Sequence, residues 1–192
     1  MALDVVGQRW TLLLIRELLP GPRRFTDLRL PGLTPNVLSD RLKHLNEVGL
    51  IEQQDLPPPA ARTVWALTDR GRQLEPAILA LGAFGASYLQ QPEGLTLSPR
   101  WLMVSLQRRY QGGVPAGVVH LTLGDSPYSV TVTPDSLTVR DGHTGSPTVT
   151  VAGPMLDLAG VLARGQALPD SVTVSGDSAY LMRWLATLIP VR

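Results

Sequence analysis

Between residues 34 and 47, apolar and polar positions recur with the period of a helix and form two stripes. At about 100° per residue, Leu38, Leu42 and Leu45 fall on one face. The opposite face is polar and consists of Asn36, Ser39, Asp40 and Lys43. The pattern predicts a helix that buries its leucines in a core and exposes its polar stripe.

Both ends of this helix are marked in the sequence. Thr34 can accept a hydrogen bond from a backbone N–H of the first turn, and Pro35 suits the first helical position because no donor is needed there. Gly49 is typical of the residue that follows a helix C-terminus. We therefore expect a short helix with defined limits.

The polar stripe offers an amide, a hydroxyl, a carboxylate and an amine near a helix N-terminus, and such groups can read base edges in a DNA major groove. The candidate DNA contacts on this helix are Thr34, Asn36, Ser39, Asp40, Arg41 and Lys43. We expect Arg41 to reach phosphate. The alternative is an ordinary amphipathic surface helix, because most surface helices share this pattern.

The segments before this helix favour the DNA-binding interpretation. Residues 4–19 have a helical apolar pattern that Pro20-Gly21-Pro22 ends. Residues 25–30 predict a brief second helix, capped by Thr26 or Asp27 and ended by Pro31-Gly32. Two helices joined by a short turn that contains glycine form a helix-turn-helix.

The segments after it predict a wing and a long helix. Residues 50–54 and 62–67 suit two strands, and the proline-rich stretch between them suits neither strand interior nor helix. Arg62 at the base of this wing can meet phosphate or remain a solvated charge, and Arg24 is a further candidate phosphate contact. Residues 68–90 then predict a helix whose small residues allow close approach by a neighbouring helix or a partner subunit.

The second half predicts a separate α+β domain. Val alternates with Thr or Ser in the expected strands, which are residues 118–123, 128–132, 136–140, 148–151 and 171–174. Such alternation indicates a mostly antiparallel five-stranded sheet that helices cover on one face. The expected helices are residues 99–111, 154–164 and 177–189. We divide the chain into a domain at 1–90, a linker at 91–97 and a domain at 98–192.

Composition narrows the classes of function. The 192 residues are 44% hydrophobic and contain no cysteine, which excludes disulfides, thiol chemistry and Cys-based zinc sites. No signal peptide and no membrane-spanning run appears, so we expect a cytoplasmic protein without a membrane partner. Residues 1–95 hold ten basic and ten acidic residues, a neutral balance that counts against tight nonspecific DNA binding.

With these elements in order, residues 2–90 resemble the HxlR family of winged helix-turn-helix transcriptional regulators, a branch of the MarR-like group. Five segments carry the resemblance: ALDVVGQRWTLLLIREL at 2–18, GPRRFTDL at 21–28, LPGLTPNVLSDRLKHL at 30–45, EVGLI at 47–51 and VWALTDRG at 64–71. The resemblance implies a homodimer that binds double-stranded DNA at a palindrome-like operator, and it implies no catalysis. Family members commonly carry a cysteine, sometimes a redox sensor, before the first helix, and this chain has none.

Residues 96–192 resemble the sterol-carrier-protein-like fold. The resemblance rests on LTVRDG at 137–142, TVTVAGPMLDLAGVLARG at 148–165 and VTVSGDSAYLMRWL at 172–185. It implies an apolar tunnel and, in a regulator, a hydrophobic effector. The expected ligand contacts are Trp101, Leu121, Val130, Val139, Val151, Leu158, Leu162 and Leu181. A plain packed core that aids dimerisation is the alternative.

Motifs for catalysis or cofactor binding are not found. His44, His120 and His143 lack metal-ligand spacing or a visible acid–base partner, and the sequence has no phosphate-binding glycine loop and no nucleophile elbow. We expect no enzyme, no metal and no cofactor. The competing hypothesis is a lipid-binding or carrier module whose winged helix serves only to pair subunits or proteins.

Overall fold

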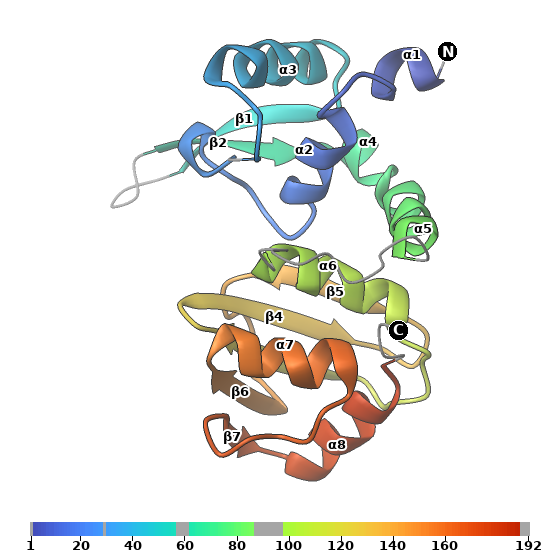
Figure 1. Ribbon diagram of the computed structural model, residues 1–192, viewed down its shortest axis with the longest axis vertical. Coiled ribbons are helices and arrows are strands. Elements are labelled where there is room, and N and C mark those ends of the chain that lie inside the picture. Colours follow the sequence, from blue (N-terminus) through green and yellow to red (C-terminus); the bar gives the residue numbers. More distant parts are fainter. Residues whose placement is uncertain (1, 29, 57–61, 87–97, 189–192) are drawn as a thin grey trace. The chain divides into compact units, whose positions relative to one another are not determined.

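The chain forms two compact units, Met1–Ala80 and Leu81–Arg192. The computed structural model describes residues 2–28, 30–56, 62–86 and 98–188 (Figure 1). The predicted linker at 91–97 and the tip of the predicted wing at 57–61 lie outside the described residues. The domain limits therefore stay a prediction, although the division into two units falls earlier than residue 90.

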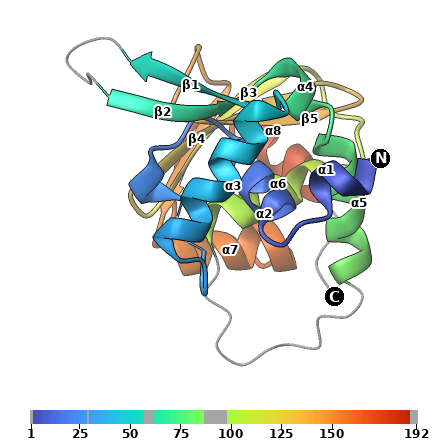
Figure 2. The ribbon, with the colours of Figure 1, turned by 90° about the horizontal axis from the view of Figure 1, so that it is seen from above.

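The first unit contains the predicted helix-turn-helix and wing. Its elements are α1 (Ala2–Val6), α2 (Thr11–Leu18), the 3-10 helix η1 (Phe25–Asp27), α3 (Pro35–Glu47), β1 (Ile51–Leu56), β2 (Arg62–Leu67) and α4 (Asp69–Arg72). Helix α5 (Glu75–Ala86) crosses the division between the units. Strands β1 and β2 lie side by side and pair antiparallel, with Ile51 opposite Leu67 (Figures 1 and 2).

The single helix expected over residues 4–19 is wrong, because the chain breaks between α1 and α2. The Gly7 N–H donates to the Leu3 carbonyl at 2.7 Å, and a Cβ at Gly7 would overlap that oxygen. Trp10 then adopts a left-handed backbone with φ 78° and precedes α2. A bulky residue rarely takes this conformation. Because apolar spacing does not report backbone angles, the sequence pattern did not predict the break.

Two further expected helices are shorter in the structure. Where a helix was expected over residues 25–30, Phe25–Asp27 form the 3-10 turn η1, which no side chain caps. The helix expected from residue 68 is divided at Gln73 and Leu74 into α4 and α5, and Thr68 caps α4 by accepting the Gly71 N–H at 3.0 Å. The expected continuation over residues 87–90 lies outside the described residues.

The second unit is the α+β fold that the alternation predicted. Its elements are α6 (Pro99–Arg109), β3 (Gly117–Leu123), β4 (Ser126–Val132), β5 (Leu137–Asp141), β6 (Val149–Gly153), α7 (Met155–Arg164), β7 (Thr173–Gly176) and α8 (Ser178–Ala186). The sheet order is β5-β4-β3-β6-β7, and only the β3–β6 pair is parallel. The prediction of a mostly antiparallel five-stranded sheet is confirmed.

One face of this sheet packs against the helices. Val119 on β3 lies opposite Val130 on β4 and Val149 on β6, and all three are buried in one apolar cluster. The cluster also takes buried residues from α6, α7 and α8, including Met103, Leu158 and Trp184. The alternate positions of the same strands hold polar residues such as Thr122, Ser129 and Thr150, together with Val118, Pro127 and Ala152. The sheet thus has one apolar face, which the helices cover, and one face that mixes polar and apolar residues.

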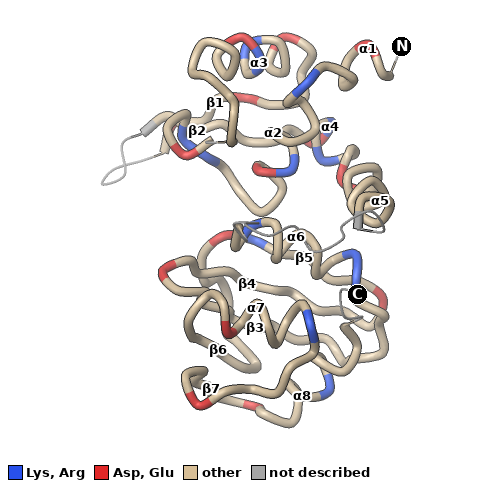
Figure 3. Tube along the Cα trace, viewed as in Figure 1, with Lys and Arg blue, Asp and Glu red and all other residues tan. Residues whose placement is uncertain are grey.

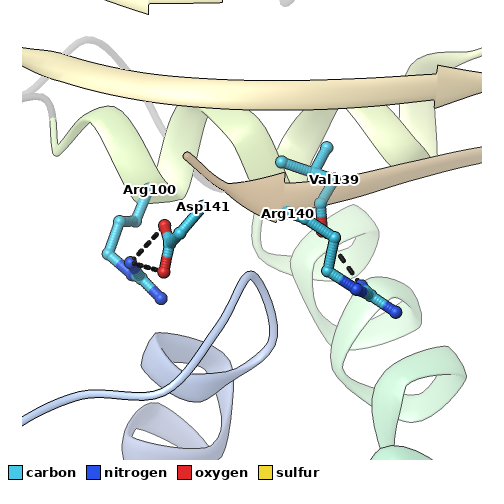
Figure 4. Close-up of polar contacts among 4 residues, drawn as sticks. All are labelled: Arg100, Val139, Arg140 and Asp141. Carbon is cyan, nitrogen blue, oxygen red and sulfur yellow. Dashed lines mark hydrogen bonds and ion pairs between the residues drawn. The ribbon is translucent and has the colours of Figure 1, made fainter. Parts of the chain in front are cut away.

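Two arginines of α6 fasten the helix to its own unit. The Arg100 guanidinium donates to both carboxylate oxygens of Asp141, at 2.6 and 2.7 Å (Figure 4). On β5, next to Asp141, Arg140 donates to the carbonyl of Val139 at 3.0 Å. Arg109 donates to the Leu162 carbonyl at 2.7 Å near the end of α7. Burial lowers the pKa of the Arg109 guanidinium to about 10, and the neighbouring positive charge of Arg108 adds to this shift.

Candidate nucleic-acid interface

Helix α3 is held in one rotational position about its axis. Thr34 precedes it in an extended conformation, and its hydroxyl oxygen accepts the Val37 N–H at 3.5 Å. Leu38, Leu42 and Leu45 are all buried, so the leucine stripe faces the core of the first unit. The helix ends at Glu47, and the predicted stop, Gly49, has φ 70°.

The polar stripe of α3 is accordingly exposed. Asn36, Ser39, Asp40 and Lys43 all lie at the surface, and among the described residues no hydrogen bond engages the first three side chains. Lys43 makes one contact, to Glu47 at 4.0 Å, with 78% of its side chain exposed. A pair this exposed contributes little, so the amine is free to take another partner.

Arg41 does not belong to this stripe. It is half-buried and lies on the flank of α3, four residues after Val37 and three before His44. One of its terminal nitrogens is buried and has no hydrogen-bond partner among the described residues. Its predicted reach to phosphate therefore starts from a different side of the helix.

The start of α4, directly after the wing, contacts the end of α3 in ways that the sequence did not predict. The Thr68 hydroxyl donates to the Gly49 carbonyl at 2.7 Å, and Arg70 donates to the Val48 carbonyl at 3.1 Å. Gly71 lies so close to the Leu50 carbonyl that a Cβ would overlap this oxygen. Together these contacts fix the start of α4 against the turn that leads from α3 into β1.

The N-terminal side of the wing is fixed by a short backbone bridge. Arg23 and Trp65 exchange two hydrogen bonds, at 2.8 Å from the Arg23 N–H and 2.6 Å from the Trp65 N–H. The bridge leaves Arg24 exposed directly before η1. Arg62 lies at the last pair of the β1–β2 ladder, opposite Leu56, and its side chain lies outside the described part of the chain.

Charge in the first unit is mixed. Helix α3 alone carries Asp40, Arg41, Lys43 and Glu47, and Figure 3 shows basic and acidic residues together on it. No continuous basic surface follows from this arrangement. A nucleic-acid interface here depends on shape and on a few placed groups more than on net charge.

The residues expected to bind a hydrophobic ligand divide into two sets. Leu121, Val130, Val139, Val151, Leu158, Leu162 and Leu181 are all buried in the apolar cluster of the second unit. Trp101 is half-buried on α6 and is not one of the buried residues of this cluster. The role of these residues as ligand contacts stays a prediction.

Two histidines of the second unit, which the sequence did not predict to be in contact, are stacked in the structure. The rings of His120 and His143 lie 4.4 Å apart, with 8° between their planes. His120 bonds the carbonyl of Thr144 at 3.0 Å, and His143 contacts the Thr122 hydroxyl at 3.2 Å.

Across the described ranges, no cluster of three or more potential metal ligands is found. Within the same ranges, no helix has the length and apolar character needed to cross a bilayer.

The sequence of the first unit is similar to a known family. The HxlR-like helix-turn-helix family matches residues 5–93. The HTH-type transcriptional regulator YvaP of Bacillus subtilis is 32% identical over 90 residues, which cover 46% of this chain and 83% of that protein. This chain belongs to the HxlR family. A transcriptional regulator of Mycobacterium tuberculosis is 45% identical over 94 residues, which cover 48% of this chain and 60% of that relative.

Solved structures of regulatory proteins match a similar share of the chain. The redox regulator HypR in its reduced form is 30% identical to this chain. The match covers 45% of this chain and 87% of the HypR chain, with a TM-score of 0.42. The reduced form of YodB from Bacillus subtilis is 28% identical. That match covers 48% of this chain and 92% of the YodB chain, with a TM-score of 0.41. This HxlR-family chain contains no cysteine.

The family match ends at residue 93, before the first described element of the sheet-containing part of the second unit. The resemblance of that part to the sterol-carrier-protein-like fold therefore gains nothing from the HxlR match and stays a prediction. The HxlR assignment rests on the elements from α1 to α5, which include α3 and the wing.

Proposed function

We propose that this chain is a homodimeric, non-enzymatic transcriptional regulator that inserts α3 into the major groove of double-stranded DNA. The observation that carries the proposal is the orientation of α3. Its leucines are buried, and Asn36, Ser39, Asp40 and Lys43 are exposed along one side of the helix. A recognition helix needs this arrangement, because its base-reading groups must leave the protein surface without disturbing the core.

The exposed groups suit particular base edges. The Asn36 amide can pair bidentately with adenine, Lys43 can donate to guanine or to phosphate, and Asp40 can accept from the cytosine amine. Ser39 can donate to or accept from several bases. Each good pair contributes on the order of 1–3 kcal/mol of discrimination. The Thr34 hydroxyl accepts the capping hydrogen bond and keeps its own proton for a phosphate.

The mixed charge of the first unit predicts a moderate salt dependence. The observed association constant for duplex DNA falls with a log–log slope of about −0.9 for each phosphate neutralised. Four cations can contribute: Arg24, Arg62 on the wing, and Arg41 and Lys43 on α3. We therefore expect a slope of roughly −2 to −4. Specific contacts then contribute a large share of the affinity.

Exposed apolar side chains support the dimer. Leu81 and Phe84 on α5 are 52% and 64% exposed, and Leu3 on α1 is 78% exposed. Their burial against a second copy gives the twofold symmetry that a palindrome-like operator matches. In such a dimer the two α3 helices read half-sites about one helical turn, roughly 34 Å, apart.

The second unit is proposed to modulate DNA binding through a hydrophobic effector. The sheet and the three helices enclose an apolar cluster of aliphatic and aromatic residues, and residues of this kind line the pockets that bind apolar molecules. Trp101 on α6 is half-buried and is not among the residues that pack against this cluster. Native mass spectrometry of the purified protein tests this part by detecting a retained ligand.

Fluorescence anisotropy with a duplex selected from a random pool tests the main proposal. Asn36→Ala and Lys43→Ala each weaken binding by about 5- to 150-fold, since each loses about 1–3 kcal/mol. Arg164→Ala is the control, because Arg164 is an exposed cation on α7 in the second unit. If both α3 variants stay folded and bind as the wild type does, the recognition helix is misassigned. Copurifying lipid without any DNA preference would instead support the carrier hypothesis.

A further inference from the structure

Arg41 has a buried guanidinium nitrogen without an acceptor among the described residues. An unsatisfied buried donor is costly, and guanidinium groups are positively charged at neutral pH. Such a group calls for an explanation in a native structure, and a bound ion is one of those that are known. The pocket that the Arg41 side chain lines indicates which class of ligand the guanidinium can meet.

Arg41 lines an open pocket of about 380 Å³ in the first unit. The other lining residues are Gln8, Arg9 and Trp10 from the break between α1 and α2, and Val37 from the first turn of α3. None of these five side chains carries a negative charge. The pocket thus combines two guanidinium groups and one amide with an aromatic ring and an aliphatic side chain.

The break between α1 and α2 builds one wall of this pocket. Trp10 keeps its left-handed backbone, φ 78°, although only glycine takes this conformation freely. The Arg9 guanidinium lies 4.6 Å from the centre of the Trp10 ring. On the ring's edge, Gly32 has φ 81°, and a Cβ there would lie 3.6 Å from the indole. The indole is therefore held between the turn before α3 and a cation.

We propose that this pocket binds an oxyanion, either a backbone phosphate of DNA or the carboxylate or phosphate of a small organic acid. The planar fork of Arg41 matches the geometry of both groups, and Arg9 supplies a second positive charge. Trp10 and Val37 provide apolar contact for the sugar in the first case and for the organic body in the second. The site goes beyond the proposed function, and only its DNA-phosphate form rests on that function.

NMR titration of the full chain with sodium benzoate and with inorganic phosphate, at constant ionic strength, tests for the site without DNA. We expect saturable shifts of the amides of residues 8–10, 37 and 41 and of the Arg41 side-chain Nε–H. Sodium chloride serves as the reference salt. Arg41→Gln and Arg9→Gln each weaken binding at least fivefold. Arg164→Gln removes an exposed charge from α7 in the second unit and leaves binding unchanged.

Two arms then distinguish the source of the anion. In the first, single methylphosphonate substitutions are scanned along the selected duplex. A position that weakens wild-type binding but not binding by Arg41→Gln identifies a DNA phosphate. In the second, benzoate weakens DNA binding by the wild type more than chloride does, and this difference disappears in Arg41→Gln. That result identifies a free organic acid as an effector at the same pocket.

The proposal is overturned if neither anion shifts these resonances more than chloride does. It is also overturned if folded Arg41→Gln and Arg9→Gln both bind the anions as the wild type does. Anion binding in a protein that shows no DNA preference would refute the proposed function and leave the oxyanion site standing. The two failures are therefore distinguishable.

Discussion

Truncation of Leu42 to alanine tests the packing that orients α3. Leu42 is 1% exposed and lies between Leu38 and Leu45 on the buried stripe. The substitution removes three carbon groups, which at about 0.8 kcal/mol each corresponds to a loss of about 2.4 kcal/mol. The cavity left behind raises the cost, so we expect Leu42→Ala to lower the free energy of unfolding by about 3 kcal/mol.

Urea denaturation followed through the NMR amide signals of the first unit measures this change. With a typical dependence of about 1–3 kcal/mol per molar urea, the unfolding midpoint falls by roughly 1–3 M. Asn36→Ala, on the exposed stripe of the same helix, changes stability by no more than about 0.5 kcal/mol. A Leu42→Ala effect below about 1 kcal/mol would refute the reasoning, because the leucine stripe would then not be packed as described.

Three other substitutions test the surrounding contacts. Gly71→Ala places a Cβ against the Leu50 carbonyl, and we expect thermal denaturation to show a loss of about 1–3 kcal/mol; an unchanged melting temperature would contradict this close approach. Asp141→Asn leaves the Arg100 guanidinium with a weaker partner and lowers the stability of the second unit by about 2 kcal/mol in urea; no loss would mean that the pair is dispensable. Thr34→Ala removes the cap of α3 at a cost of about 1 kcal/mol. Faster amide exchange in the first turn of α3 reports this loss, and unchanged exchange would argue against the cap.

The features that the sequence predicted well are those that one element encodes by itself. The cap at Thr34, the buried leucines and the glycine after α3 all follow from residues within 34–49. The period-two alternation likewise predicted the strands and the one-sided covering of the second sheet. Local periodicity and capping suffice where burial on one face determines the structure.

The features that it missed depend on contacts between distant residues. The break before α2 needs the unusual backbone of Trp10, and apolar spacing does not report φ. The placement of Arg41 in a pocket with Arg9 depends on how that break meets α3. The stacking of His120 on His143 follows from the return of the chain after β5. Pairings of this kind are set by tertiary packing, which residue patterns within single elements do not specify.

Selection of bound duplexes from a random DNA pool tests the central claim most directly. The account predicts enrichment of one palindrome-like sequence whose half-site centres lie about one helical turn apart. It also predicts that Asn36→Ala relaxes the preference at a symmetric pair of positions while the protein remains folded. A pool that stays random after repeated rounds with the folded wild-type protein would contradict the assignment of α3 as a DNA-reading helix.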